Sequence, residues 1–138
     1  MAKDIFHNAV KRALEKDGWK ITHDPYRLRY GIVEVYIDLA AEEAIAAEKE
    51  GRKIAVEVKS FAGASNISEF HTALGQFLNY RIALETSDEP ERVLYLAVPR
   101  DVYQTFLSFE PAKTVIERYQ VLLIIYSSDR EEIVRWIS

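Results

Sequence analysis

The chain has 138 residues, of which 49% are hydrophobic and 29% charged, and its net charge is −4. This length fits one domain with a core that buries about two-thirds of the unfolded surface. With no cysteine, the sequence excludes disulfides, thiolate zinc sites and cysteine nucleophiles. It has no apolar run of about 18 residues, so we expect no membrane span. The N-terminus lacks the apolar segment of a signal peptide, which makes a cytoplasmic location the default expectation.

The charge is unevenly distributed along the chain. Residues 1–30 hold seven Lys or Arg and four acids, a net +3, while the remaining residues carry −7. Such a basic segment either contacts phosphate groups or forms the solvated face of a helix, and composition favours the second interpretation. The overall negative charge argues mildly against a nucleic-acid binder.

The first half of the chain is predicted to form one helix followed by strands. Residues 3–17 carry an apolar stripe at helical spacing. Residues 19–22 and 32–39 are strand candidates, and the second of them alternates apolar and polar positions. The Ala/Glu-rich stretch 40–51 has helical propensity but joins two strands. We therefore expect an extended hairpin connection there, with at most one helical turn, followed by a strand over 52–60.

The second half is predicted to begin with a long helix over 65–85, with Asn66 and Glu69 as its capping pair. The early strands alternate, so we expect them to be antiparallel with one face covered. The later strands are apolar throughout, which is typical of burial on both faces. The fold class is therefore α/β, with a mixed central sheet in a single domain. The remaining elements are buried strands over 92–98 and 120–126, and short helices over 100–108, over 111–118 and around Val134 and Trp136.

Two strands of the predicted sheet each carry a carboxylate on the less apolar face. Asp38 lies near the end of strand 32–39, Glu57 lies in strand 52–60, and period-two geometry puts Lys59 on the face of Glu57. If these strands pair, the two carboxylates lie close together and repel each other unless a cation compensates their charge. Mg²⁺ prefers such oxygen ligands. A neighbouring lysine can orient a water or neutralise a phosphoryl transition state.

This spacing resembles the PD-(D/E)xK nuclease superfamily, in which an Asp at a strand end and a Glu-x-Lys on the next strand hold Mg²⁺. Here 18 residues separate Asp38 from Glu57, and Ile37 stands where the superfamily has proline. On the long helix, Gln76 and Tyr80 match the Gln-x-x-x-Tyr pattern of members related to the RecB nuclease. The resemblance implies a restriction-endonuclease-like mixed β-sheet flanked by helices. It also implies Mg²⁺ or Mn²⁺ on Asp38 and Glu57, with Lys59, Gln76 and Tyr80 completing the catalytic site.

Longer stretches are similar to the XisH family of cyanobacterial excision controlling factors. They read DIFHNAVKRALEKDGWKITHDP, VYIDLAAEEAIAAEKEGRKIAVEVKSF and HTALGQFLNYR, and the likeness covers essentially the whole chain. Membership implies a role in the programmed excision of a DNA element, alongside a site-specific recombinase and a small partner protein, XisI. It does not by itself establish nuclease activity.

Three functions therefore stay open at the level of the sequence. The first is a Mg²⁺-dependent endonuclease that acts on DNA during excision. The second is a non-catalytic module on the nuclease fold that binds a partner and controls the recombinase, which the acidic composition favours. The third is a hydrolase of another phosphodiester, such as RNA. His7 is either an extra metal ligand or a half-buried helix histidine, with the second favoured, and self-association of the chain is left open.

Overall fold

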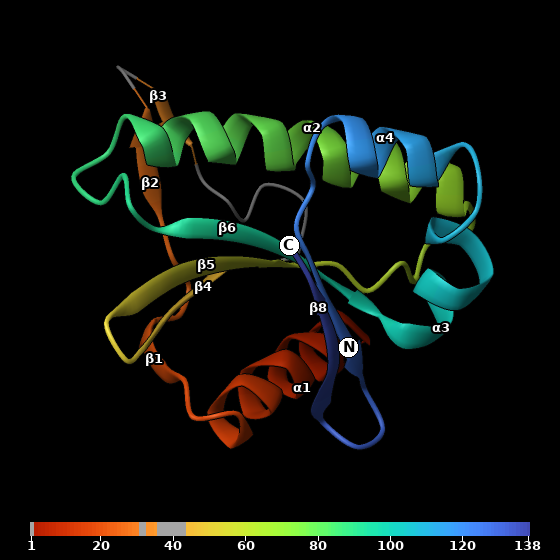
Figure 1. The fold of residues 1–138 in the computed structure, drawn as a ribbon, viewed down its shortest axis with the longest axis horizontal. Coiled ribbons are helices and arrows are strands. Elements are labelled where there is room, and N and C mark those ends of the chain that lie inside the picture. The colour runs from red at the N-terminus through yellow and green to blue at the C-terminus, as the bar shows by residue number, and fades with distance from the viewer. Residues whose placement is uncertain (1, 31–32, 36–43) are drawn as a thin grey trace.

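The computed structural model describes residues 2–30, 33–35 and 44–138. A mixed six-stranded sheet has the strand order β1-β4-β5-β6-β7-β8, and β2 pairs with β3 in a separate two-stranded sheet. Figure 1 shows α1 on one face of the large sheet and α2 with α4 on the other. The predicted α/β class, with a mixed sheet flanked by helices, is confirmed.

The helical elements, with their bounds, are α1 (Ala2–Lys16), α2 (Asn66–Glu85), α3 (Arg100–Val102), the π-helical turn η1 (Tyr103–Leu107) and α4 (Ala112–Arg118). The strands are β1 (Lys20–His23), β2 (Leu28–Tyr30), β3 (Val33–Val35), β4 (Ala44–Lys49), β5 (Arg52–Val58), β6 (Val93–Pro99), β7 (Leu123–Ser127) and β8 (Glu132–Ile137). Strands β5, β6 and β7 are mutually parallel, whereas β1, β4 and β8 run antiparallel to their neighbours.

Strand β5 lies inside the sheet and is covered on both faces. The buried residues among those described form two clusters, one on each face of the sheet. Ile54 and Val56 pack in one cluster with Val10 of α1, and Ala55 packs in the other with Phe77 of α2. The expectation that the early strands have one covered face is therefore wrong for β5. The alternation is misleading here because Glu57 and Lys59, which make one face look polar, are themselves buried.

The Ala/Glu-rich stretch expected as a connection contains a strand. Ala44–Lys49 forms β4, which pairs antiparallel with both β1 and β5. Glu50 and Gly51 make the hairpin turn with φ of 51° and 79°, the left-handed conformations that a tight hairpin needs. Ala46 and Ala47 are completely buried, so packing between the two helical layers overrides the helical propensity of alanine.

Two further expectations about the strands are corrected. The segment Val33–Val35 pairs with β2, so the antiparallel neighbour of β5 is β4 rather than the predicted strand 32–39. The tail expected to be a short helix is strand β8, which pairs with β7. There Trp136 packs 5.7 Å from the ring of Trp19 and 5.0 Å from that of Tyr95, a contact that the sequence pattern of the tail alone does not reveal.

Helix α2 is capped by Ser65 and not by Asn66, because the Ser65 Oγ accepts a hydrogen bond from the Ser68 N–H at 3.3 Å. Glu69 instead accepts from the Gly63 N–H at 2.8 Å, which ties the preceding loop to the first turn.

We expect Ser65→Ala to lower the free energy of unfolding by about 1 kcal/mol, because the substitution leaves a helix N–H without its acceptor. Urea denaturation measures this, with the exposed Ser68→Ala as control; an equal loss in both variants would contradict the assignment.

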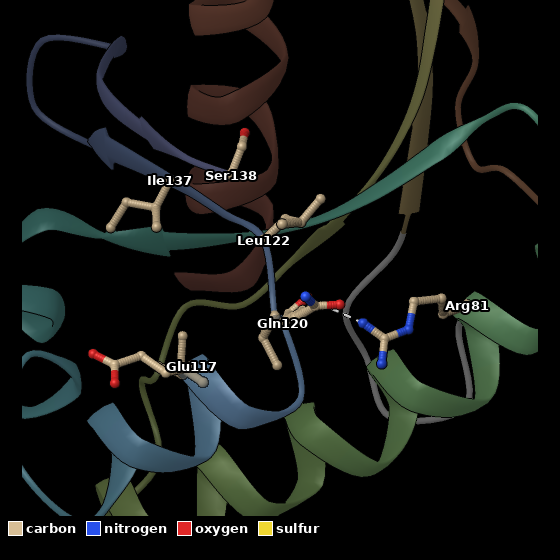
Figure 2. A pocket seen from close by; sticks show the side chains of 8 residues that line it. Arg81, Glu117, Gln120, Leu122, Ile137 and Ser138 are labelled. Atoms are coloured by element: carbon tan, nitrogen blue, oxygen red, sulfur yellow. Dashed lines mark hydrogen bonds between the residues drawn. The ribbon is translucent and has the colours of Figure 1, made fainter.

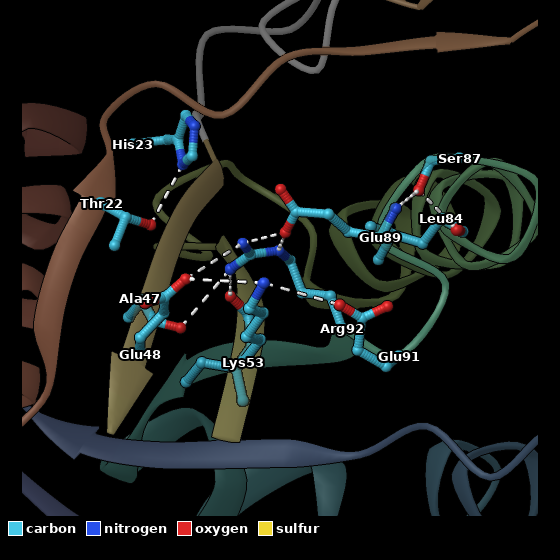
Figure 3. A network of polar contacts seen from close by, with 11 residues as sticks. Thr22, His23, Ala47, Glu48, Lys53, Leu84, Ser87, Glu89, Glu91 and Arg92 are labelled. Carbon is cyan, nitrogen blue, oxygen red and sulfur yellow. Dashed lines mark hydrogen bonds and ion pairs between the residues drawn. The ribbon is translucent and has the colours of Figure 1, made fainter. Parts of the chain in front are cut away.

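A buried arginine ties the loop after α2 to the hairpin β4–β5 (Figure 3). Arg92 is 3% exposed and donates to the Ile54 carbonyl at 2.9 Å and, through Nε, to Glu89 Oε2 at 2.7 Å. Its guanidinium carbon lies 5.1 Å from the centre of the Tyr26 ring. Because these partners come from separate parts of the chain, Arg92 links β5, the loop before β6 and the segment before β2.

Candidate functional site

The candidate site lies where the parallel strands β5 and β6 end. Glu57 is the penultimate residue of β5 and stands opposite Ala44 of β4 and Leu96 of β6. By alternation it is on the face of Ala55, which packs beneath α2. Lys59 follows with the same parity, and its N–H donates to the Ala97 carbonyl at 3.0 Å, so the ladder continues past the end of β5.

Both charged side chains are almost completely buried. Glu57 is 2% exposed and Lys59 is 3% exposed. Burying an ionised group costs several kcal/mol unless partners compensate it, and Glu57 does have an interaction partner. Burying two ionisable side chains at the end of a central strand destabilises the fold. Buried ionisable groups of this kind are typical of functional sites.

The backbone around Lys59 is held from several directions. The Tyr126 hydroxyl of β7 donates to the Lys59 carbonyl at 3.4 Å, reaching past β6. Ser60 follows, and its Oγ accepts from the Ala62 N–H at 3.4 Å. Phe61 then has φ of 55° while its ring is buried under α2, an unfavourable conformation for a bulky residue that the surrounding packing maintains. These contacts fix the position of Lys59 at the site.

Helix α2 brings the second predicted pair over the same face of the sheet. Tyr80 is 4% exposed and belongs to the buried cluster that contains Ala55 of β5. Gln76, one turn earlier, is half-buried. The structure thus places Tyr80 against the face of β5 that carries Glu57, with Gln76 on the adjoining turn of α2.

Asp38, the predicted second carboxylate, lies outside the described residues. Within the part of the chain that the structure describes, no three His, Asp or Glu side chains are grouped so that they could hold a metal ion. Glu57 therefore supplies the site with one carboxylate, a donor that suits Mg²⁺ but does not make a site by itself. The metal centre on Asp38 and Glu57 stays a prediction.

The structure pairs His7 of α1 with a carboxylate. Its Nε2 lies 2.8 Å from Asp24 Oδ1, and Lys11 Nζ lies 3.0 Å from Asp24 Oδ2. Arg12 pairs with Glu131. Several basic side chains of the N-terminal segment are thus paired with acidic side chains within the molecule.

These contacts make stability depend on pH. Burial raises the pKa of Asp24, but the hydrogen bonds from Lys11 and His7 outweigh it and hold that pKa below its usual value. A lowered pKa stabilises the fold above the unfolded pKa of about 3.9, and the contribution disappears as the pH falls through the folded pKa. We expect Asp24→Asn to be less stable than wild type at pH 7, and the difference in the free energy of unfolding to shrink as the pH falls through the lowered folded pKa of Asp24. Urea denaturation across this range tests this, with exposed Asp129→Asn as control; a difference independent of pH would contradict it.

The sequence did not single out Tyr126 or Phe61. Tyr126 holds the Lys59 backbone through a contact between residues distant in the chain, and a tyrosine at the end of an apolar strand is a weak signal on its own. Phe61 acts through its backbone conformation, which the sequence does not show. Ser60, the residue after Lys59, is also buried, with 5% of its surface exposed.

The family model described as XisH protein matches residues 1–134. A solved structure of an XisH family protein from Nostoc punctiforme PCC 73102 is 54% identical with a TM-score of 0.90, covering 98% of this chain and 100% of that chain. The structure of an fdxN element excision controlling factor protein from Anabaena variabilis is 51% identical with a TM-score of 0.89, covering 98% and 99%. Comparison with curated proteins gave no match.

Proposed function

The chain belongs to the XisH family, and from this premise we propose that it acts in the programmed excision of a DNA element. The support is the likeness, over nearly the whole of both chains, to a protein described as an fdxN element excision controlling factor. At this identity and TM-score, the elements that carry Glu57 and Lys59 are expected to be shared between the two proteins. The proposed partners are DNA and a small XisI-like protein.

Within that role we propose a phosphodiester hydrolysis site at the end of β5. The observation that carries it is the burial of Glu57 and Lys59 at the carboxyl end of a central strand, on the face whose Ala55 packs in one cluster with Tyr80. Asp38 and Glu57 would hold Mg²⁺ or Mn²⁺, which when bound supplies charge neutralisation at the phosphate. Lys59 would orient the attacking water, and Gln76 and Tyr80 would support Lys59 or the phosphate.

A non-catalytic role is the second candidate, and one observation favours it specifically. With Glu57 at 2% and Lys59 at 3% exposure, a phosphate reaches neither group without movement of the surrounding chain. The net charge of −4 also opposes the approach of DNA. In this role the module would bind a partner protein, or a second copy of itself, and control the recombinase.

The deciding experiment is cleavage of supercoiled, single-stranded and branched DNA, and of RNA, in Mg²⁺ and in Mn²⁺. Wild type is compared with Asp38→Asn and Lys59→Ala, each checked for folding by circular dichroism. Cleavage by wild type that both folded variants lack would support the nuclease. Cleavage that survives in Lys59→Ala would rule out this site as its source.

Binding at increasing salt separates the two candidates when no cleavage is seen. A DNA complex made through several phosphate contacts loses affinity by orders of magnitude between low and moderate salt. An apolar protein interface is much less affected. Retained binding of an XisI-like protein at moderate salt, together with no DNA binding at low salt, would favour the controlling module.

A further inference from the structure

Two adjoining cavities lie at the end of the sheet opposite to Glu57 and Lys59. The larger has a volume of about 530 Å³ and the smaller about 160 Å³, and both are lined by Arg81 and Leu122. They form one groove along the second half of α2, beside the first residues of β6 and the segment that enters β7. Figure 2 shows the larger cavity, with Arg81 on one side and Ile137 and Ser138 of the β8 end on the other.

The groove is mainly apolar on both sides of Arg81. Ile116, Val121 and Ile137 line the larger cavity, and Leu84, Val93 and Leu94 line the smaller one. Val93 is 41% exposed, and Tyr119, beside the larger cavity, is 52% exposed. Large apolar side chains left in contact with water around a hollow are typical of a surface that binds another molecule.

Arg81 places a positive charge where the two cavities meet. Arg92 also lines the smaller cavity, but it forms an ion pair with Glu89. The Arg81 Nη1 donates to the carbonyls of Tyr119 at 2.9 Å and Gln120 at 3.0 Å, which holds the guanidinium at the end of α4. The group also lies 5.2 Å from the centre of the Phe77 ring. Among the ion pairs of the described residues, none involves Arg81. The two carbonyls accept from Nη1, which leaves the guanidinium edge made by Nε and Nη2 for a ligand. This edge can bind a carboxylate through two hydrogen bonds.

Carboxylates line the groove on either side of this charge. Glu117 lines the larger cavity and Glu85 the smaller one. Together they disfavour a polyanion or an anionic lipid surface, because such ligands would bring negative charge onto both glutamates. A ligand with apolar groups on both sides of a single carboxylate fits the two cavities and Arg81. Basic groups at the two ends of the ligand would pair with Glu117 and Glu85.

We propose that this groove docks a segment of a partner protein, whose apolar side chains fill the two cavities and whose Asp or Glu side chain binds Arg81. A peptide segment supplies apolar groups on both sides of one acidic residue, which is the arrangement that the two cavities and Arg81 require. The site is distinct from the end of β5, and the inference does not depend on nuclease activity.

The test is selection of binders from a displayed library of random linear peptides on the full chain. We expect the enriched sequences to carry an Asp or Glu between apolar residues. Fluorescence anisotropy of a labelled, enriched peptide should show an affinity about tenfold lower for Arg81→Gln and for Val93→Asp. Replacing the peptide carboxylate by its amide should weaken binding to wild type about tenfold but have little further effect on Arg81→Gln, which isolates the pair.

The controls separate docking from folding. Arg81→Gln loses two hydrogen bonds to the end of α4, so its thermal unfolding is measured first. Val93 lines the smaller cavity, and Val93→Asp leaves the hydrogen bonds of Arg81 in place. Exposed Arg118→Gln on α4, outside both cavities, should bind the peptide as wild type does. The proposal is overturned if no peptide is enriched, if enriched peptides lack a carboxylate, or if they bind Arg81→Gln as well as wild type. Binding of decanoate at Arg81 without any peptide binder would assign the groove to a small amphiphilic acid and equally refute it.

Discussion

Replacing Glu57 and Lys59 together by methionine is expected to abolish the proposed phosphodiester cleavage while leaving the free energy of unfolding unchanged or raised by up to about 4 kcal/mol. Both side chains are at most 3% exposed, so the fold pays a desolvation cost for each charge. Methionine keeps a similar length without a charge and fits between β5 and α2. Loss of activity combined with retained or increased stability is the expected signature of charges that are kept for chemistry.

The measurements are urea denaturation and the cleavage assay on the same preparations. The matched control is Glu48→Met with Lys53→Met, a pair directly opposite each other on the same hairpin, with side chains 41% and 36% exposed. This exposed pair should change stability by at most about 1 kcal/mol and leave cleavage intact. A loss of more than about 3 kcal/mol in the Glu57/Lys59 variant would instead assign the buried charges to the fold. The stability result is informative even if wild type cleaves no DNA.

Local periodicity was sufficient to predict α1, α2 and the buried strands. The stripe over residues 3–17 matches α1 to within a residue at each end, and the helix predicted over 65–85 is α2. Strand β5 was predicted for the same reason, because its β-branched residues alternate with smaller or charged ones. Alternation also placed Glu57 on a face separate from Val56 and Val58, and the structure agrees, since these two valines pack with α1.

Strand pairing could not be predicted in the same way, because it depends on partners distant in the chain. Nothing within Ala44–Lys49 indicates that it lies between β1 and β5, and its alanines favour a helix in isolation. The residues of β8 become a strand because β7 offers them a hydrogen-bonding edge. The expected proximity of Asp38 to Glu57 relied on pairing strand 32–39 with β5, and the described part of that segment pairs with β2.

Arg92 illustrates the same limit at the level of a single side chain. In the sequence it is an unremarkable start to an apolar strand. In the structure it precedes β6, is buried, and contacts Tyr26, Ile54 and Glu89, none of which the local pattern connects to it. Its importance for the fold is therefore a prediction that only the structure supplies.

We expect Arg92→Met to lower the free energy of unfolding by about 3–5 kcal/mol, a large part of the stability of a domain of this size. Removing the guanidinium leaves the Ile54 carbonyl buried without its donor and the Glu89 carboxylate without its cation. Arg92→Lys should recover only part of the loss, because an ammonium lacks the planar fork that reaches these two acceptors together. Exposed Arg100→Met should stay within about 0.5 kcal/mol of wild type.

The effect of Arg92 should also depend on pH in a defined direction. The hydrogen bond from Arg92 holds the pKa of Glu89 below its usual value, so the pair stabilises the fold above the unfolded pKa of Glu89. That share of the stability disappears as the pH falls through the lowered folded pKa. Urea denaturation should therefore show a difference in the free energy of unfolding between wild type and Arg92→Met that becomes smaller in acid. It should not vanish, because the Ile54 carbonyl needs its donor at every pH. A difference below about 1 kcal/mol at pH 7 would mean that Arg92 fills space in the fold without holding its parts together.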